Sequence, residues 1–282
     1  MKNSVADRGK RLLLAGATAI VSLYAAPQEP QPAFDVASIK LDVSGEPGGL
    51  FTCVPNCHLE RMTLKALVIL AYRVHDFQVA GGPGWIDSDR YNIDAKAEGA
   101  PSFNQEYVAL QYRRLQTLLH DRFSLTIHHE TKELPVYELT VAKGGPKLQQ
   151  PKCVQREPGD FTIAPGKYCG LMGGSMASGR IQASGATVTF LANYLSNSLG
   201  RTVVDKTGIT GEFDFQLAFT PEKPAVPSPD AAGPRPADGA AAADLGPDFF
   251  TAMREQLGLK LESARGPVEV LVVDHVERPS EN

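Results

Sequence analysis

The sequence lacks the features that most directly assign a protein to a functional class. Its 282 residues carry 28 Lys and Arg against 32 Asp and Glu, and no basic cluster occurs beyond the N-terminus. Because nucleic-acid-binding domains usually show a basic stripe, the net charge of −4 argues against that class of partner. After the first 26 residues no segment is apolar enough to span a membrane, which takes about 20 apolar residues.

Short catalytic and cofactor-binding motifs are also missing. The chain holds no Gly-x-Ser-x-Gly nucleophile elbow, no Gly-x-x-x-x-Gly-Lys phosphate loop and no His-Glu-x-x-His zinc motif. Hydrophobic residues make up 43% of the chain and charged residues 21%, as in ordinary globular proteins, so a full core is expected. The sequence therefore predicts a globular protein with no cofactor and no metal, and it favours a protein that is not an enzyme.

The chain has four cysteines, in two pairs that are local in sequence. Cys53 lies close to Cys57, and Cys153 lies close to Cys169. Free thiols and a four-thiolate zinc site are alternatives, but the spacing differs from the Cys-x-x-Cys knuckles of zinc sites. The sequence favours two local disulfides, which indicate an oxidising compartment.

The N-terminus resembles an export signal. Lys2, Arg8, Lys10 and Arg11 precede an uncharged apolar run from Leu12 to Ala26. The run is too short to span a bilayer comfortably, so we expect a signal peptide over residues 1–26. The protein is then periplasmic or extracellular, with no membrane span after signal removal; the alternative is an uncleaved N-terminal membrane anchor.

Similar patterns recur in the two halves of the chain. Thr63 and Thr187 each suit a helix N-cap before an apolar helical run. A repeat this long predicts a duplicated domain, with one α+β unit at 34–148 and a second at 179–277. We expect a linking loop at 149–178 and a disordered, proline-rich insertion at 221–247.

Each half is expected to order its elements as strand, helix, strand, helix and hairpin. Strands are predicted at 34–39, 50–52 and 91–95, a helix at 107–121, and a turn at the glycine-rich segment 81–85. The first hairpin is predicted from 123–129 and 136–142, joined by the polar residues 130–133. Together these elements predict an α+β fold, with antiparallel strand pairing, helices on one face of the sheet and a pseudo-two-fold relation between the halves.

Several linked segments carry a resemblance to a known family. They are FDVASIK (34–40), GGPGWIDSDRY (81–91), ELPVY (133–137), AKGGPKL (142–148), VVDKTG (203–208) and EQLGLKL (255–261). Together they resemble the soil-associated family of exported proteins that is expanded in Acidobacteria, a domain of unknown function. The resemblance implies no established activity, cofactor or catalytic residue. Some related domains are joined to membrane peptidases of the antibiotic-sensor type, which implies a sensing or binding role outside the cytoplasm.

The most suggestive polar cluster is His128-His129-Glu130. On a strand, His128 and Glu130 share one face, so they are the catalytic candidates. They would hold zinc only if a third ligand joined them: His75, His120 or His275. The alternative is a set of solvated side chains beside a turn.

Two aromatic residues are candidates for ligand binding. Trp85, the single tryptophan, lies in the glycine-rich turn, and Tyr91 follows it closely. An exposed ring there would suit stacking against a ligand, whereas a buried ring would belong to the core.

The sequence favours a secreted or periplasmic binding or interaction module, sensor-like and not enzymatic. Its ligand would be an unknown protein, a peptide or a cell-envelope component, bound by β-augmentation at an open sheet edge. The first alternative is an exported hydrolase with a site between the halves that uses His128 and Glu130. The second alternative is a structural component of the cell envelope.

Overall fold

The computed structural model describes residues 31–46, 48–53, 56–97, 105–154, 167–221 and 246–279. The signal peptide expected at 1–26 and nearly all of the insertion expected at 221–247 lie outside the described residues. None of the helices in the described ranges is long and apolar enough to cross a membrane.

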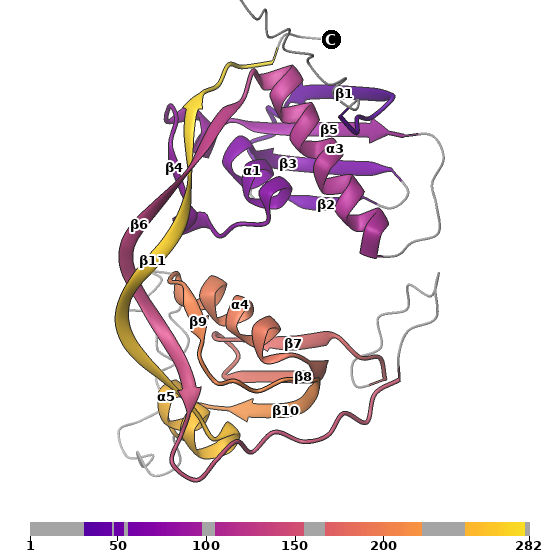
Figure 1. The fold of residues 1–282 in the computed structure, drawn as a ribbon. Coiled ribbons are helices and arrows are strands. Elements are labelled where there is room, and N and C mark those ends of the chain that lie inside the picture. The colour runs from indigo at the N-terminus through magenta and orange to yellow at the C-terminus, as the bar shows by residue number, and fades with distance from the viewer. Residues whose placement is uncertain are drawn as a thin grey trace, which may run out of the picture. The chain divides into compact units, whose positions relative to one another are not determined.

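The first half holds an antiparallel sheet with two helices against one face (Figure 1). The sheet order is β1-β5-β3-β2. In chain order the elements are β1 (Val36–Leu41), β2 (Leu50–Cys53), β3 (Cys57–Thr63), α1 (Leu64–Tyr72), η1 (Asp76–Gln78), β4 (Val79–Gly81), α2 (Trp85–Ser88), β5 (Arg90–Lys96) and α3 (Gln105–Phe123). The predicted strands and the predicted helix at 107–121 are therefore present, with shifted ends.

Local residues account for both ends of helix α1. The Thr63 hydroxyl accepts a hydrogen bond from the Ala66 amide at 3.2 Å, which confirms the predicted N-cap. Arg73 ends the helix in the left-handed conformation, with φ of 56°. Leu64, Leu67 and Val68 are buried on the face that turns toward the sheet.

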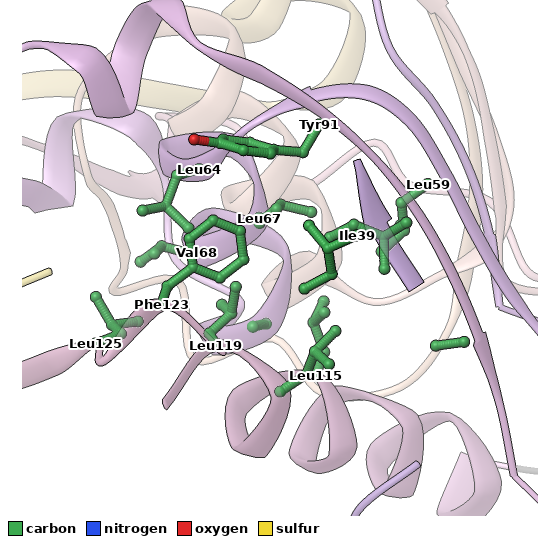
Figure 2. Close-up of a cluster of buried hydrophobic side chains, with 14 of the residues drawn as sticks. Ile39, Leu59, Leu64, Leu67, Val68, Tyr91, Leu115, Leu119, Phe123 and Leu125 are labelled. Atoms are coloured by element: carbon green, nitrogen blue, oxygen red, sulfur yellow. The ribbon is translucent and has the colours of Figure 1, made fainter. Parts of the chain in front are cut away.

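Those side chains belong to what we call the first core, the buried cluster shown in Figure 2. Residues from β1, β3, α1, β5 and α3 meet there, together with Leu125 between α3 and β6. The labelled side chains are Ile39, Leu59, Leu64, Leu67, Val68, Tyr91, Leu115, Leu119, Phe123 and Leu125. The Tyr91 and Phe123 rings meet edge to face, with centroids 5.2 Å apart. This core joins the sheet to both helices.

The second half has a smaller antiparallel sheet, in the order β10-β8-β7, with α4 against one face (Figure 1). Its elements are β7 (Leu171–Ser175), β8 (Arg180–Ala186), α4 (Val188–Leu199), β9 (Val203–Asp205), β10 (Phe213–Ala218), α5 (Phe249–Ala252) and the π-helical turn η2 (Met253–Leu257). The Thr187 hydroxyl accepts from the Phe190 amide at 3.1 Å, which confirms the second predicted N-cap. A second core of buried residues includes Ile181, Leu191 and Phe215.

Strand β7 lies inside the segment 149–178 that was expected to be a loop. Its sequence, LMGGS, shows no alternation of apolar and polar residues, so no strand pattern is visible there. Pairing with β8 holds it in place instead, since strand formation depends strongly on neighbouring strands.

The predicted hairpins are wrong. Residues 126–141 form one continuous strand, β6 (Thr126–Val141), and β11 (Leu259–His275) is a second long strand that pairs with it antiparallel along its length. We call this pair the ribbon (Figure 1). It is completed by β4, parallel to β11, and by β9, parallel to β6, so both halves contribute to one sheet.

The proline that suggested a break in β6 lies where a strand tolerates it. The Tyr137 amide donates to the Thr202 carbonyl at 2.8 Å, so it points away from β11. Pro135 is two residues earlier and therefore turns its nitrogen to the same outer side. The pairing with β9 covers only Tyr137 to Leu139. Pro135, which has no backbone N–H to donate, therefore lies outside the paired stretch.

The fold is α+β, as predicted, with mainly antiparallel sheets. The ribbon contributes to both cores: Val273 belongs to the first core and Ile127 packs against it, and Leu139 and Leu259 belong to the second. In each half a strand leads into a capped helix, a short strand, a further strand, a helical segment and a long strand. An internal duplication stays a prediction.

Candidate functional site

On β6, the side chains of His128, His129 and Glu130 each contact a different partner on the ribbon. The Nδ1 atom of His128 lies 2.8 and 2.9 Å from the two carboxylate oxygens of Asp274 on β11. His129, on the other face of the strand, places Nδ1 2.8 Å from Glu269. Glu130 forms an ion pair with Lys132 at 2.9 Å. All of these side chains are exposed, and the cluster does not form one joint site.

The three other histidines proposed as a third ligand also have other contacts. His75 stacks on Phe77, with ring centroids 5.3 Å apart, and burial lowers the pKa of its imidazole. His120 and His275 each approach a nearby acidic side chain, at 2.9 and 3.1 Å. Within the described ranges no group of three or more His, Cys, Asp or Glu is placed to hold a metal ion. The hydrolase alternative thus stays a prediction without an assembled site.

Trp85 opens the short helix α2 and packs partly against the first core. The Arg278 guanidinium lies over its ring, 4.9 Å from the centroid, and the Arg278 Nε donates to Asp89 at 2.9 Å. One face of the indole is therefore in contact with a cation. A ligand-binding role for Trp85 stays a prediction. A ligand that stacked on the covered face of the indole would have to displace the Arg278 side chain or bind beside it.

Tyr91, the second aromatic candidate, lies inside the first core and is only 1% exposed. Its hydroxyl is buried and has no hydrogen-bond partner among the described residues. Burial raises the pKa of this phenol, with a smaller contribution from the charge of Asp89. The ring packs against Phe123 and so offers no exposed face to a ligand.

Both predicted disulfides are present. Cys53 and Cys57 face each other at the end of the β2–β3 pair, where a disulfide joins them. Cys153 and Cys169 form the second disulfide, which lies against Gly185 of β8. The first bridge therefore joins the ends of β2 and β3, and the second lies against the central strand of the β10-β8-β7 sheet. Cys53 also lines the pocket described next.

An apolar pocket of about 190 Å³ lies beside Cys53, where β2 meets the two helices of the first half. Its lining comes from β2, α1 and α3, through Phe51, Cys53, Leu70, Val108, Gln111, Tyr112 and Leu115. Phe51 is 53% exposed although it is a large apolar residue. The Arg73 guanidinium lies 5.6 Å from the centroid of the Tyr112 ring, so one cation lies near an otherwise apolar site.

Strand β2 is an edge strand, paired only with β3 within the described part of the chain. Phe51 and Cys53 are two residues apart, so they share the face that lines the pocket. Leu50, on the opposite face, is 62% exposed. An edge with open backbone groups and exposed apolar side chains is a template for pairing with another strand.

Sequence patterns did not reveal this site. The strand at 50–52 was predicted, and its Leu50-Phe51 pair is a visible apolar signal. However, the pocket also needs Leu70 from α1 and Tyr112 from α3, and the approach of these helices is set by tertiary packing. The predicted strand at 50–52, helix at 107–121 and disulfide at Cys53 each contribute to the pocket wall, but their sequence patterns do not indicate that they meet.

Comparison with known proteins identifies a family. A protein-family model described as "Protein of unknown function (DUF3738)" matches residues 65–276. No match was found among curated proteins or among solved structures.

Proposed function

Since the chain belongs to the DUF3738 family of proteins of unknown function, we propose a function from its surfaces: a binding module that seats an extended apolar peptide segment at the β2 edge. The observation that carries this proposal is the coincidence of an edge strand with an apolar pocket directly beside it. Peptide recognition by strand addition needs both parts. Backbone pairing supplies affinity, and pockets for alternate side chains supply specificity.

The size of the pocket points to a side chain rather than to a whole small molecule. Pockets for drug-sized ligands hold about 300–1,000 Å³, whereas this one holds about 190 Å³. An added strand beside β2 would turn every second side chain toward the pocket. The partner is therefore a segment in which apolar residues alternate with polar ones.

The proposal places this binding outside the cytoplasm. Two disulfides favour an oxidising compartment, and the basic and apolar start of the chain is typical of an export signal. The likeness to the soil-associated family of exported proteins supports the same location. The partner is then an exported protein, a peptide or a component of the cell envelope.

Isothermal titration with two matched peptides tests the proposal. The first probe is an N-acetylated, amidated octapeptide that alternates leucine with serine and lysine, and the second has the same composition with its leucines contiguous. We expect the alternating peptide to bind at least about tenfold more tightly, because seating one leucine is worth roughly 1.5–3 kcal/mol. Phe51→Asp should abolish this preference by placing a charge at the mouth of the pocket.

Phe190→Asp is the matched control, since Phe190 is a similarly exposed phenylalanine, at 42%, on α4 of the second half. It should bind the alternating peptide as the unmodified protein does. Equal affinity for both peptides, or equal losses in both variants, would reject the β2 site. Mass spectrometry of the recovered peptide addresses the alternative: cleavage that disappears in His128→Ala would favour the hydrolase over the binding module.

A further inference from the structure

A polar hollow of about 450 Å³ lies on the exposed side of the second half. Its floor is the pair β8 and β10, and its walls are the segment after β6 and the end of η2. Polar side chains dominate the lining, which comprises Lys147, Gln149, Lys152, Gln182, Ala183, Ser184, Asp214, Phe215, Gln216, Gln256 and Leu257. The volume falls in the range of sites that take small ligands.

The outer edge of β10 is capped at two positions beside this hollow. The backbone of Asp214 exchanges two hydrogen bonds with the backbone of Gln149, at 2.9 and 3.0 Å. Four residues later, the Gln256 side-chain amide accepts from the Ala218 N–H at 2.9 Å and donates to the Ala218 carbonyl at 2.7 Å. The Gln149 backbone and the Gln256 side-chain amide thus take the place of a neighbouring strand, because each supplies one donor and one acceptor to β10.

Gln216 lies midway between those two capped positions. Along an antiparallel strand, every second residue directs its N–H and C=O to the same side. The backbone groups of Gln216 therefore face outward like those of Asp214 and Ala218. Among the described residues nothing pairs with that side of Gln216, since β10 has β8 and the Gln149 bridge as its partners. One donor and one acceptor are left open beside the hollow.

The charges around the hollow favour an anionic group. Lys152 contributes an ammonium group that has no hydrogen bond or ion pair within the described ranges. Lys147 adds a second ammonium, which donates to the Glu255 carbonyl at 2.6 Å. The single carboxylate, that of Asp214, already accepts from the amides of Lys152 and Gly185, at 2.9 and 2.8 Å. A carboxylate on a ligand would therefore meet the free ammonium of Lys152.

We propose that this hollow is a second binding site, which takes a short peptide that carries a carboxylate. One amide of the peptide pairs with the open backbone groups of Gln216, in the manner of the Gln149 and Gln256 contacts on either side. The carboxylate binds Lys152, and the side chains of Gln182 and Gln216 are available as further hydrogen-bond partners. The site is independent of the β2 edge, because the two share no residue.

Titration calorimetry with acetyl-Ala-Glu-Ala-amide and acetyl-Ala-Gln-Ala-amide tests the site, because the two probes differ in the carboxylate alone. We expect the glutamate peptide to bind about fivefold more tightly, as an exposed ion pair contributes up to about 1 kcal/mol. Lys152→Met should remove that advantage and leave the affinity for the glutamine peptide unchanged. Lys143→Met, which removes an exposed lysine that does not line the hollow, is the matched control.

The backbone contact has its own readout in the amide resonance of Gln216. It should shift during titration with the glutamate peptide and should lose that shift when the peptide nitrogens are methylated. Phe51→Asp should leave both effects intact, which separates this site from the β2 edge. No binding of the glutamate peptide, equal affinity for both peptides, an unchanged affinity in Lys152→Met or a silent Gln216 resonance would each overturn the proposal.

Discussion

Arg278 and Trp85 form a contact between the end of the described chain and the helix α2. The guanidinium carbon lies 4.9 Å from the centroid of the indole ring, and the same guanidinium donates to Asp89 at 2.9 Å. A residue that follows the ribbon is thereby attached to the segment that leads into β5. The contact covers one face of the only tryptophan in the sequence, so the fluorescence of the protein reports on it directly.

Replacing Arg278 by alanine should expose the Trp85 ring. We expect a red shift of the emission and stronger quenching by acrylamide, together with a loss of roughly 0.5–1 kcal/mol in unfolding free energy. Arg254→Ala is the control, because Arg254 is exposed in η2 and lies in the second half. If both variants leave the emission unchanged, the cation does not cover the ring in solution.

Gly185 is required by the disulfide that it touches. A Cβ at this position would lie 2.6 Å from the Cys153 sulfur and 2.7 Å from the Cys169 Cβ, and the residue has φ of +57°. Gly185→Ala should therefore lower the unfolding free energy by roughly 3 kcal/mol, from backbone strain and overpacking together. Denaturant unfolding under non-reducing conditions measures the loss.

Gly200 separates the two contributions. It ends α4 with φ of +61°, close to that of Gly185, but a Cβ there would meet nothing within 4 Å. Gly200→Ala should therefore cost only the backbone term, about 1 kcal/mol. Equal losses in the two variants would mean that the disulfide does not press on β8.

The stability of the protein should fall on acidification through His75. Burial lowers the pKa of His75 below its ordinary value of 6.5, so the folded protein binds this proton more weakly than the unfolded chain does. The associated stability is present in full above pH 6.5 and is lost as the pH falls through the folded-state pKa. His75→Phe keeps a ring stacked on Phe77 but cannot be protonated. Between roughly pH 7.5 and 5, the variant should lose less stability than the unmodified protein; parallel curves would refute this assignment.

The local parts of the fold could be predicted from sequence because their signals are local. Thr63 and Thr187 cap helices through their own hydroxyls, and the apolar spacing behind them gives the buried face. The two disulfides followed from short separations. These features depend on residues that are near each other in the chain.

The ribbon could not be predicted in the same way. The polar residues from Glu130 to Glu133 and the nearby Pro135 are typical of a turn, and a hairpin satisfies that pattern. The structure instead pairs Pro135 with Arg265 and Glu133 with Pro267 of a strand more than a hundred residues away. Local propensity cannot indicate such a partner, since strand pairing is decided by tertiary context.

The same distinction between local signals and long-range contacts applies to the candidate site. The edge strand at Leu50 and Phe51 was predicted, but the pocket beside it depends on how α1 and α3 approach each other. Conversely, the adjacency of His128 and Glu130 in sequence suggested a joint site, whereas each found a different partner on the ribbon. Residue type and spacing therefore indicated candidates, and the long-range strand pairing decided their contacts.

Metal content is the remaining prediction, and it bears on the hydrolase alternative. Within the described ranges His128 meets Asp274, His129 meets Glu269, and no third ligand joins either pair. Because a protein zinc site needs three or four ligands, we expect protein purified without a histidine tag to contain far less than one equivalent of zinc. Incubation with a chelator should leave its unfolding midpoint unchanged, since the described residues include no group of side chains placed to hold a metal ion. Stoichiometric zinc that disappears in His128→Ala, with His120→Ala as the control, would instead establish a metal centre on the ribbon and favour the hydrolase.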